Sequence, residues 1–183
     1  MAYRSKFISG QEFDPFKDRL CRHIRNQLSK SFIQAIDSGD IRQLKTVVGH
    51  FSEQGLKPYM RDYIENRVKR YQAIINQAKS SQNQARHMIA LLLWNNELFF
   101  EFHELLEKEW LRATGSEKLV LQALIRAAGT YLFLNHGRIH GATKMAAKAV
   151  TGLKQHKDSV PACFDADLLM AKLSALDPIP PKF

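Results

Sequence analysis

The sequence predicts an all-α protein, an antiparallel bundle of about seven or eight helices joined by short loops. Three observations support this fold class. Apolar residues recur at helical spacing through most of the 183 residues. No segment of the sequence shows the alternating pattern of a strand or a hairpin turn. Asp, Gly and Pro stand where the helical pattern breaks, as they do at helix ends.

Eight helices are expected along the chain. Their approximate ranges are 15–37, 41–53, 58–78, 84–94, 96–113, 117–135, 138–154 and 161–176. Asp14 before Pro15 is a typical helix start, an N-cap carboxylate followed by proline in the first turn. The segment Ser38-Gly39-Asp40 is expected to end the first helix and cap the second. Three prolines predict an extended C-terminal tail: Pro178, Pro180 and Pro181.

The composition is that of a soluble globular protein, with 45% apolar and 25% charged residues. The two cysteines, Cys21 and Cys163, lie far apart and form no CxxC pair, which disfavours a zinc cluster or a disulfide framework. The longest apolar run, Met88 to Trp94, falls well short of the roughly 18–20 residues that span a bilayer. With no apolar run at the N-terminus, the sequence favours a cytoplasmic protein without a membrane partner.

The net charge of +9 is unevenly distributed. Residues 1–90 hold 16 Lys and Arg against 8 Asp and Glu, and residues 91–183 hold 11 against 10. We therefore expect two regions, a basic N-terminal helical extension at 1–90 and a helical core with a C-terminal helix at 91–183. No long linker separates them, so we expect them to pack as one unit.

Candidate chemistry concentrates in residues 96–136. On the helix that carries His103, apolar residues form one broad arc and one smaller arc when placed at about 100° steps. The broad arc contains Leu98, Phe99, Phe102, Leu105, Leu106 and Trp110. The smaller arc contains Phe100 and Leu111. His103 and Glu107 lie between these arcs, which predicts that both are partly buried and need polar partners. Glu97, Glu101 and Glu104 are expected on the outer face.

The next helix is apolar nearly all round, as a central helix should be. Gln122, Arg126 and Gly129 share one of its faces. We expect this face to meet His103 and Glu107, because the two helices form a hairpin. A buried arginine needs a carboxylate, so the prediction is an ion pair from Arg126 to Glu104 or Glu107. The whole predicted polar cluster is His103, Glu104, Glu107, Trp110, Gln122 and Arg126.

Three segments in this region resemble a known family. Residues 100–110 read F-E-F-H-E-L-L-E-K-E-W, similar to the F-E-x-H-E-x-L-E-x-x-W signature of domain-of-unknown-function family 309. Residues 121–126 and 135–142 resemble the family's L-Q-G-L-I-Q and R-G-N-x-x-G-A elements, in the same order and spacing. The resemblance covers roughly residues 94–155. It implies a small all-helical fold and brings no established activity.

The chain also departs from the family pattern. Arg126 stands where the family often has glutamine, and Phe133 stands where it often has histidine. Arg138 replaces the asparagine that follows the glycine. If the family's polar residues bind a ligand, these changes weaken metal binding in this chain.

A metal site is one functional hypothesis. His103 and Glu107 lie one helical turn apart, and Glu104 is a candidate general base. The pattern lacks the second histidine of H-E-x-x-H, so a divalent metal needs a third ligand. His136 and His140 are candidates, although both are expected near the far end of the second helix. An alternative is therefore a metal-dependent or small-molecule enzyme using His103, Glu104 and Glu107.

Other enzyme classes are disfavoured. The sequence has no G-x-S-x-G, P-loop or G-x-G-x-x-G motif. Cys21 and His23 are close in number, but two residues apart on a helix their side chains point apart.

The leading hypothesis is a non-enzymatic binding or interaction module with a buried His/Glu/Gln/Arg cluster. Its partner would be another protein or a second copy of the chain. A second alternative is nucleic-acid binding through the basic N-terminal half, where Tyr59, Tyr63 and Tyr71 are present. Tyr71 falls on the apolar face of its helix and is expected in the core.

Overall fold

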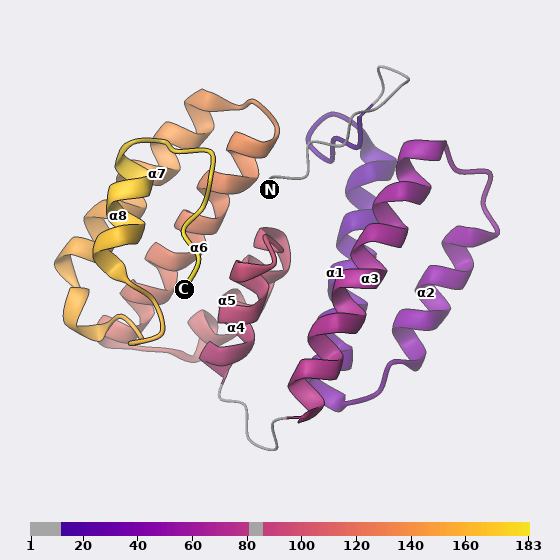
Figure 1. Ribbon diagram of the computed structural model, residues 1–183, viewed down its shortest axis with the longest axis horizontal. Helices are drawn as coiled ribbons and strands as arrows, with labels where there is room; N and C mark the ends of the chain where they lie inside the picture. Colours follow the sequence, from indigo (N-terminus) through magenta and orange to yellow (C-terminus); the bar gives the residue numbers. More distant parts are fainter. Residues whose placement is uncertain (1–11, 81–85) are drawn as a thin grey trace. The chain divides into compact units, whose positions relative to one another are not determined.

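The computed structural model describes residues 12–80 and 86–183 and confirms the all-α fold class. Within these ranges the chain forms eight α-helices, one short 3₁₀-helix and no strand (Figure 1). None of the helices in this part of the chain is long and apolar enough to cross a membrane.

The chain divides into two compact units, Met1–Gln82 and Asn83–Phe183. The first contains α1 (Arg19–Ser38), α2 (Arg42–Ser52) and α3 (Pro58–Ser80). The second contains α4 (Arg86–Asn95), α5 (Phe99–Arg112), α6 (Gly115–Asn135), α7 (Ile139–Gln155), η1 (Lys157–Ser159) and α8 (Ala166–Ser174). The predicted packing of both regions as one unit stays a prediction.

In the first unit, α1 packs against both α2 and α3. Ile24, Leu28 and Phe32 form the buried stripe of α1, as their spacing predicts. The ring of Phe32 stacks on Tyr71 of α3, with centroids 4.1 Å apart. The expected core position of Tyr71 is confirmed, since its side chain is fully buried.

The predicted start of the first helix was one turn early. The Asp14 carboxylate accepts a hydrogen bond from the Phe16 backbone N–H, and its carbonyl accepts one from Asp18, so Asp14-Pro15 opens a separate turn. Asp18 is the N-cap of α1, and its Oδ1 accepts hydrogen bonds from the backbone N–H groups of Leu20 and Cys21. Asp14 and Asp18 lie one turn apart, and either carboxylate can accept the N-cap hydrogen bonds. The following proline favoured Asp14, which was the wrong choice.

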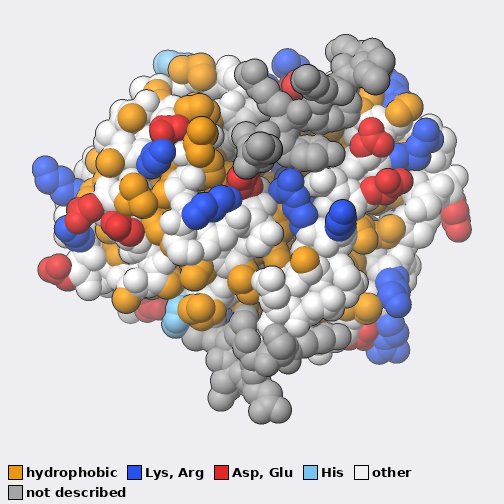
Figure 2. All heavy atoms as spheres, viewed as in Figure 1, with side chains coloured by type: hydrophobic (Ala, Val, Ile, Leu, Met, Phe, Trp, Pro, Cys, Tyr) orange, Lys and Arg blue, Asp and Glu red, His pale blue; other side chains and the backbone are white. Residues whose placement is uncertain are grey.

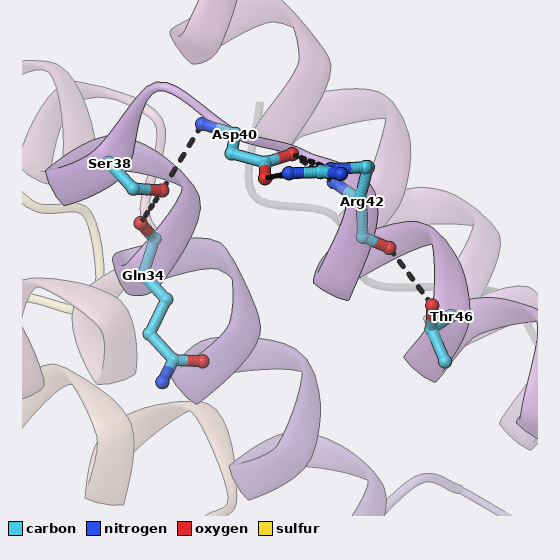
Figure 3. A network of polar contacts seen from close by, with 5 residues as sticks. All are labelled: Gln34, Ser38, Asp40, Arg42 and Thr46. Carbon is cyan, nitrogen blue, oxygen red and sulfur yellow. Dashed lines mark hydrogen bonds and ion pairs between the residues drawn. The ribbon is translucent and has the colours of Figure 1, made fainter.

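The predicted end of α1 at residues 38–40 is confirmed (Figure 3), whereas the N-cap of α2 is Ile41, which makes no side-chain cap. Gly39 ends α1 with φ +71°, a left-handed conformation that glycine adopts without a Cβ clash. The Ser38 hydroxyl donates to the Gln34 carbonyl and accepts from the Asp40 backbone N–H. The Asp40 carboxylate accepts from both the backbone and the side chain of Arg42, and this pairing lowers the pKa of Asp40.

In the second unit, α6 packs against α5 and α7, while α8 packs on α7. The α6–α7 contact is close because small residues line it, as the predicted run of glycine and alanine in α7 implies. A Cβ on Gly152 would lie 2.9 Å from the Cβ of Ala123. Ala142, Ala146 and Ala149 of the predicted set are buried, whereas Ala147 is exposed.

Trp94 is the centre of the aromatic core of the second unit. Its side chain is fully buried, and five aromatic rings surround it: Phe99, Phe102, Tyr131, Phe164 and Phe183. These rings come from α5, α6, the segment before α8 and the C-terminal tail. Trp94 therefore links four separate segments of the chain.

Two features near the C-terminus differ from expectation. The last helix begins at Ala166 and not at Pro161, because Asp165 is its N-cap and accepts from the Leu168 backbone N–H. The tail predicted from its prolines packs against the end of α4. The Trp94 indole donates to the Pro181 carbonyl at 2.9 Å, and the Asn95 side chain makes two hydrogen bonds with the Phe183 backbone.

Candidate functional site

The predicted site residues lie on α5 and α6, two helices that form a hairpin in the second unit. A turn with a left-handed residue at Glu97 (φ +56°) joins α4 to α5. Two backbone hydrogen bonds close this turn, from Glu97 to Trp94 and from Leu98 to Leu93, the pattern of a Schellman motif. The turn sets the direction of α5 relative to α4, the helix that carries the buried Trp94.

The expected burial of the α5 acids was wrong in two places. Glu107, predicted to be partly buried, is exposed, and Glu101, predicted on the outer face, is fully buried. The buried stripe of α5 contains Glu101, Phe102 and Leu105, so it is rotated from the arc that the apolar residues alone indicate. His103 is consequently half-buried, and Glu107 lies in solvent.

His103 is half-buried, with 31% of its side chain exposed. Its Nδ1 atom is shielded from solvent and has no hydrogen-bond partner within the described part of the chain. Nδ1 lies 3.3 Å from Oε1 of Glu104, outside hydrogen-bonding geometry. The imidazole lies nearly parallel to the ring of Phe100, with centroids 6.3 Å apart.

The structure brings His103, Glu104 and Glu107 together, and we call these three residues the α5 cluster. One ligand atom from each residue lies within 4.8 Å of the others. The exposure of the members ranges from the half-buried His103 to the exposed Glu107. His136 and His140, the third ligands considered from the sequence, lie at the α6–α7 connection and are outside the cluster.

The predicted ion pair of Arg126 is wrong. Among the described residues, no salt bridge or hydrogen bond joins Arg126 to Glu104 or Glu107. Arg126 and Gln122 instead line a groove with residues of α7. Thr130, one turn further along α6, is fully buried and donates to the Arg126 carbonyl. The predicted single polar cluster is therefore divided: three of its members come together on α5, whereas Gln122 and Arg126 line a groove with α7.

Trp110, also assigned to the predicted cluster, has a different contact. It is half-buried, and the Lys118 ammonium of α6 lies 4.5 Å from its ring centroid. This cation–π contact joins the end of α5 to the start of α6. Trp110 thus supports the hairpin and stands outside the α5 cluster.

Neither cysteine is an activated nucleophile. Burial, together with the charge of Asp18, raises the pKa of the Cys21 thiol to about 11. Burial also raises the pKa of Cys163. Both thiols therefore stay protonated at neutral pH, whereas nucleophilic cysteine requires the thiolate.

The three tyrosines considered for nucleic-acid binding make contacts within the protein. Tyr59 and Tyr71 are buried. The Tyr63 ring stacks on Phe13 at 3.5 Å, and the Arg67 guanidinium lies 5.1 Å from the same ring. On the face shown in Figure 2, Lys and Arg over α2 and α3 are interspersed with Asp and Glu. Single-strand binding usually uses exposed aromatic rings for base stacking and a continuous basic stripe. This face does not support either feature.

These observations define the second unit as a small all-helical domain with a histidine–glutamate cluster beside its central hairpin. Residues 89–145 match the model of the family described as Domain of unknown function (DUF309), which confirms the resemblance seen in the sequence. The matched part of the chain contains the α5 cluster and Arg126. No curated protein and no solved structure matches the chain.

Proposed function

We propose that the second unit is a metal-binding module in which His103, Glu104 and Glu107 hold a divalent transition-metal ion. One observation supports the proposal most strongly. A solvent-shielded imidazole nitrogen without a hydrogen bond lies beside two carboxylates that can reach the same point. Shielded polar atoms normally have a partner, and a cation coordinated by Nδ1 would provide one.

The distances fit such an ion. Zinc–nitrogen and zinc–oxygen bonds are about 2.0–2.2 Å, so two ligands on one ion lie roughly 2.8–3.6 Å apart at octahedral or tetrahedral angles. The separation of 3.3 Å between His103 Nδ1 and Glu104 Oε1 falls in this range. The ligand atoms of the cluster spread over as much as 4.8 Å, so one side chain must move closer. Glu107 is exposed and is free to change rotamer.

The ligand types select among metals. One imidazole nitrogen and two carboxylate oxygens suit zinc, manganese or iron(II), because magnesium and calcium prefer oxygen ligands alone. Three ligands from one helix leave further coordination positions open. Within residues 12–80 and 86–183 no ion pair joins Arg126 to Glu104 or Glu107, so its guanidinium does not neutralise a carboxylate of the site.

Two pockets of the second unit, the groove on α6 and α7 and a second pocket near Phe164, are not lined by the α5 cluster. A metal-dependent enzyme would need a substrate pocket next to the ion. An enzyme using His103, Glu104 and Glu107 therefore remains the alternative.

Metal titration of the full chain tests the proposal. Isothermal titration with Zn²⁺ and Mn²⁺ is expected to give one site per chain. His103→Ala should weaken that site by about 100-fold or more, because even residues behind the ligands contribute 10–100-fold. His140→Ala is the matched control, an exposed histidine of α7 outside the cluster, and should leave affinity unchanged. Equal affinity in wild type and His103→Ala would refute the proposal.

A further inference from the structure

A groove of about 290 Å³ lies along the surface that α6 shares with α7, and its lining includes no residue of α5. Six of its lining residues matter for its chemistry: Gln122 and Arg126 of α6, Ala147, Lys148 and Gly152 of α7, and His156, which follows α7. Gln122 and Arg126 are two of the polar residues for which the sequence predicted another location. We call this feature the α6–α7 groove.

The hollow shape follows from two small residues. Ala147 and Gly152 place little side-chain volume on the α7 side of the groove. Gly152 is required by the packing, because a Cβ there would lie 2.9 Å from Ala123 Cβ. The two helices therefore pack closely beside the groove.

The groove has a strongly positive character. Arg126, Lys148 and His156 line it, and no carboxylate does. Within the described residues, none of these three side chains has a carboxylate within salt-bridge distance. The sequence of α7 contains three lysines and no acid. A guanidinium and an ammonium that share a hollow without an acidic partner create a local positive potential.

Two features oppose this potential. The C-terminus of α7 carries about half a negative charge from its helix dipole, and it lies at the His156 end. The η1 helix adds the exposed Asp158 close to that end. The two permanent cations, Arg126 and Lys148, outweigh the partial charge of the dipole, and they come from the middle of their helices, away from the helix end.

We propose that the α6–α7 groove binds a small organic anion that carries a phosphate or a carboxylate group. The Arg126 guanidinium pairs with two oxygens of such a group, and Lys148 adds a second charge. The Gln122 amide supplies a neutral donor. Leu119, which is 44% exposed at the edge of the groove, offers an apolar surface for the rest of the ligand. The volume lies at the lower end of the range for ligand pockets, which limits the ligand to a small molecule.

Titration with pyrophosphate and with citrate, in the full chain without added metal, tests the proposal and separates phosphate from carboxylate ligands. At least one probe is expected to saturate one site at low ionic strength. Arg126→Gln, which keeps a similar length and removes the charge, should weaken that binding by about tenfold or more, as for a charged hydrogen bond. Lys144→Gln removes a charge from α7 outside the groove and should change affinity less than twofold.

A second variant tests the location of the site without changing charge. Ala147→Leu fills the groove from an exposed position and should reduce binding by a similar factor, whereas Thr143→Leu, one turn away, should not. His103→Ala should leave anion binding intact, so this proposal and the metal proposal fail independently. Two results would overturn the groove site: no saturable binding of either probe at millimolar concentration, or equal losses in Arg126→Gln and Lys144→Gln.

Discussion

Two regions of the second unit carry opposite kinds of polar chemistry. On α5, a histidine and two glutamates form a cluster suited to a cation. Between α6 and α7, an arginine, a lysine and a histidine line a groove suited to an anion. The sequence predicted one mixed cluster in which these charges neutralise each other. Their separation indicates that each region is available for a ligand, because neither set uses the other as its partner.

The apolar character of α6 explains why Gln122 and Arg126 were assigned to the wrong neighbouring helix. Its buried residues include Val120, Ala123, Leu124, Ala127 and Thr130, which spread over a wide arc in contact with both neighbouring helices. A helix that is apolar nearly all round gives no pattern to show which face meets which neighbour. The hairpin connection suggested that Gln122 and Arg126 face α5. In the structure both residues line the groove with α7 instead.

The largest expected effect comes from the core that both sites share. Trp94→Ala removes a fully buried ring that contacts α5, α6 and the C-terminal tail, and should lower the free energy of unfolding by about 3–5 kcal/mol. Urea denaturation followed by circular dichroism measures this loss, and both ligand sites should weaken together. Trp110→Ala is the control, since Trp110 is half-buried. An equal loss in both variants would contradict the central role of Trp94.

A smaller change, at Gly152, should affect the α6–α7 groove only. Gly152→Ala places a Cβ 2.9 Å from Ala123, and overpacking of this kind costs about 1–3 kcal/mol against a gain of about 1 kcal/mol in helix propensity. The expected net destabilisation is about 1 kcal/mol, with weaker anion binding and unchanged metal binding. At Gly129 the nearest atom, in Met145, lies 3.8 Å away, so Gly129→Ala should stabilise by up to about 1 kcal/mol. Shifts of the same sign in both variants would refute this view of the α6–α7 contact.

The smallest effect concerns pH and the tail. The Lys172 side chain hydrogen-bonds the Asp177 carboxylate at 2.6 Å and, with the Ile179 backbone N–H, lowers the pKa of Asp177. A lowered folded-state pKa gives stability that is present above the ordinary value of 3.8 and is lost as pH falls through the folded value. Tryptophan fluorescence of the tail contact should therefore change in acid below about pH 4, and Asp177→Asn should lack this component. An identical acid transition in both proteins would assign it to other carboxylates.

Much of the fold was predictable because helix periodicity and turn residues are local signals. The turn at Ser38-Gly39-Asp40 and the core position of Tyr71 needed no knowledge of neighbours. The cap of α1 was less certain, because Asp14 and Asp18 carry the same chemistry and only the backbone path distinguishes them. The matched family segment followed from motifs that occupy a single stretch of chain.

Predicting the site was harder because it depends on contacts between helices. Glu101 lies on the buried stripe beside Phe102, a position that sequence rules assign to apolar residues. The tail contact with Trp94 and Asn95 joins residues more than 80 positions apart, and its prolines gave only an extended conformation. His103, Glu104 and Glu107 were found because all three stand within five residues of one helix.

The central claim is that the α5 cluster binds a cation independently of Arg126. Zn²⁺ titration of wild type, His103→Ala and Arg126→Gln tests it most directly. The account predicts that His103→Ala loses the site, while Arg126→Gln keeps wild-type affinity within about twofold because no salt bridge joins Arg126 to the cluster. A large gain of affinity in Arg126→Gln would show that the arginine neutralises the cluster, and retained binding in His103→Ala would place the metal elsewhere.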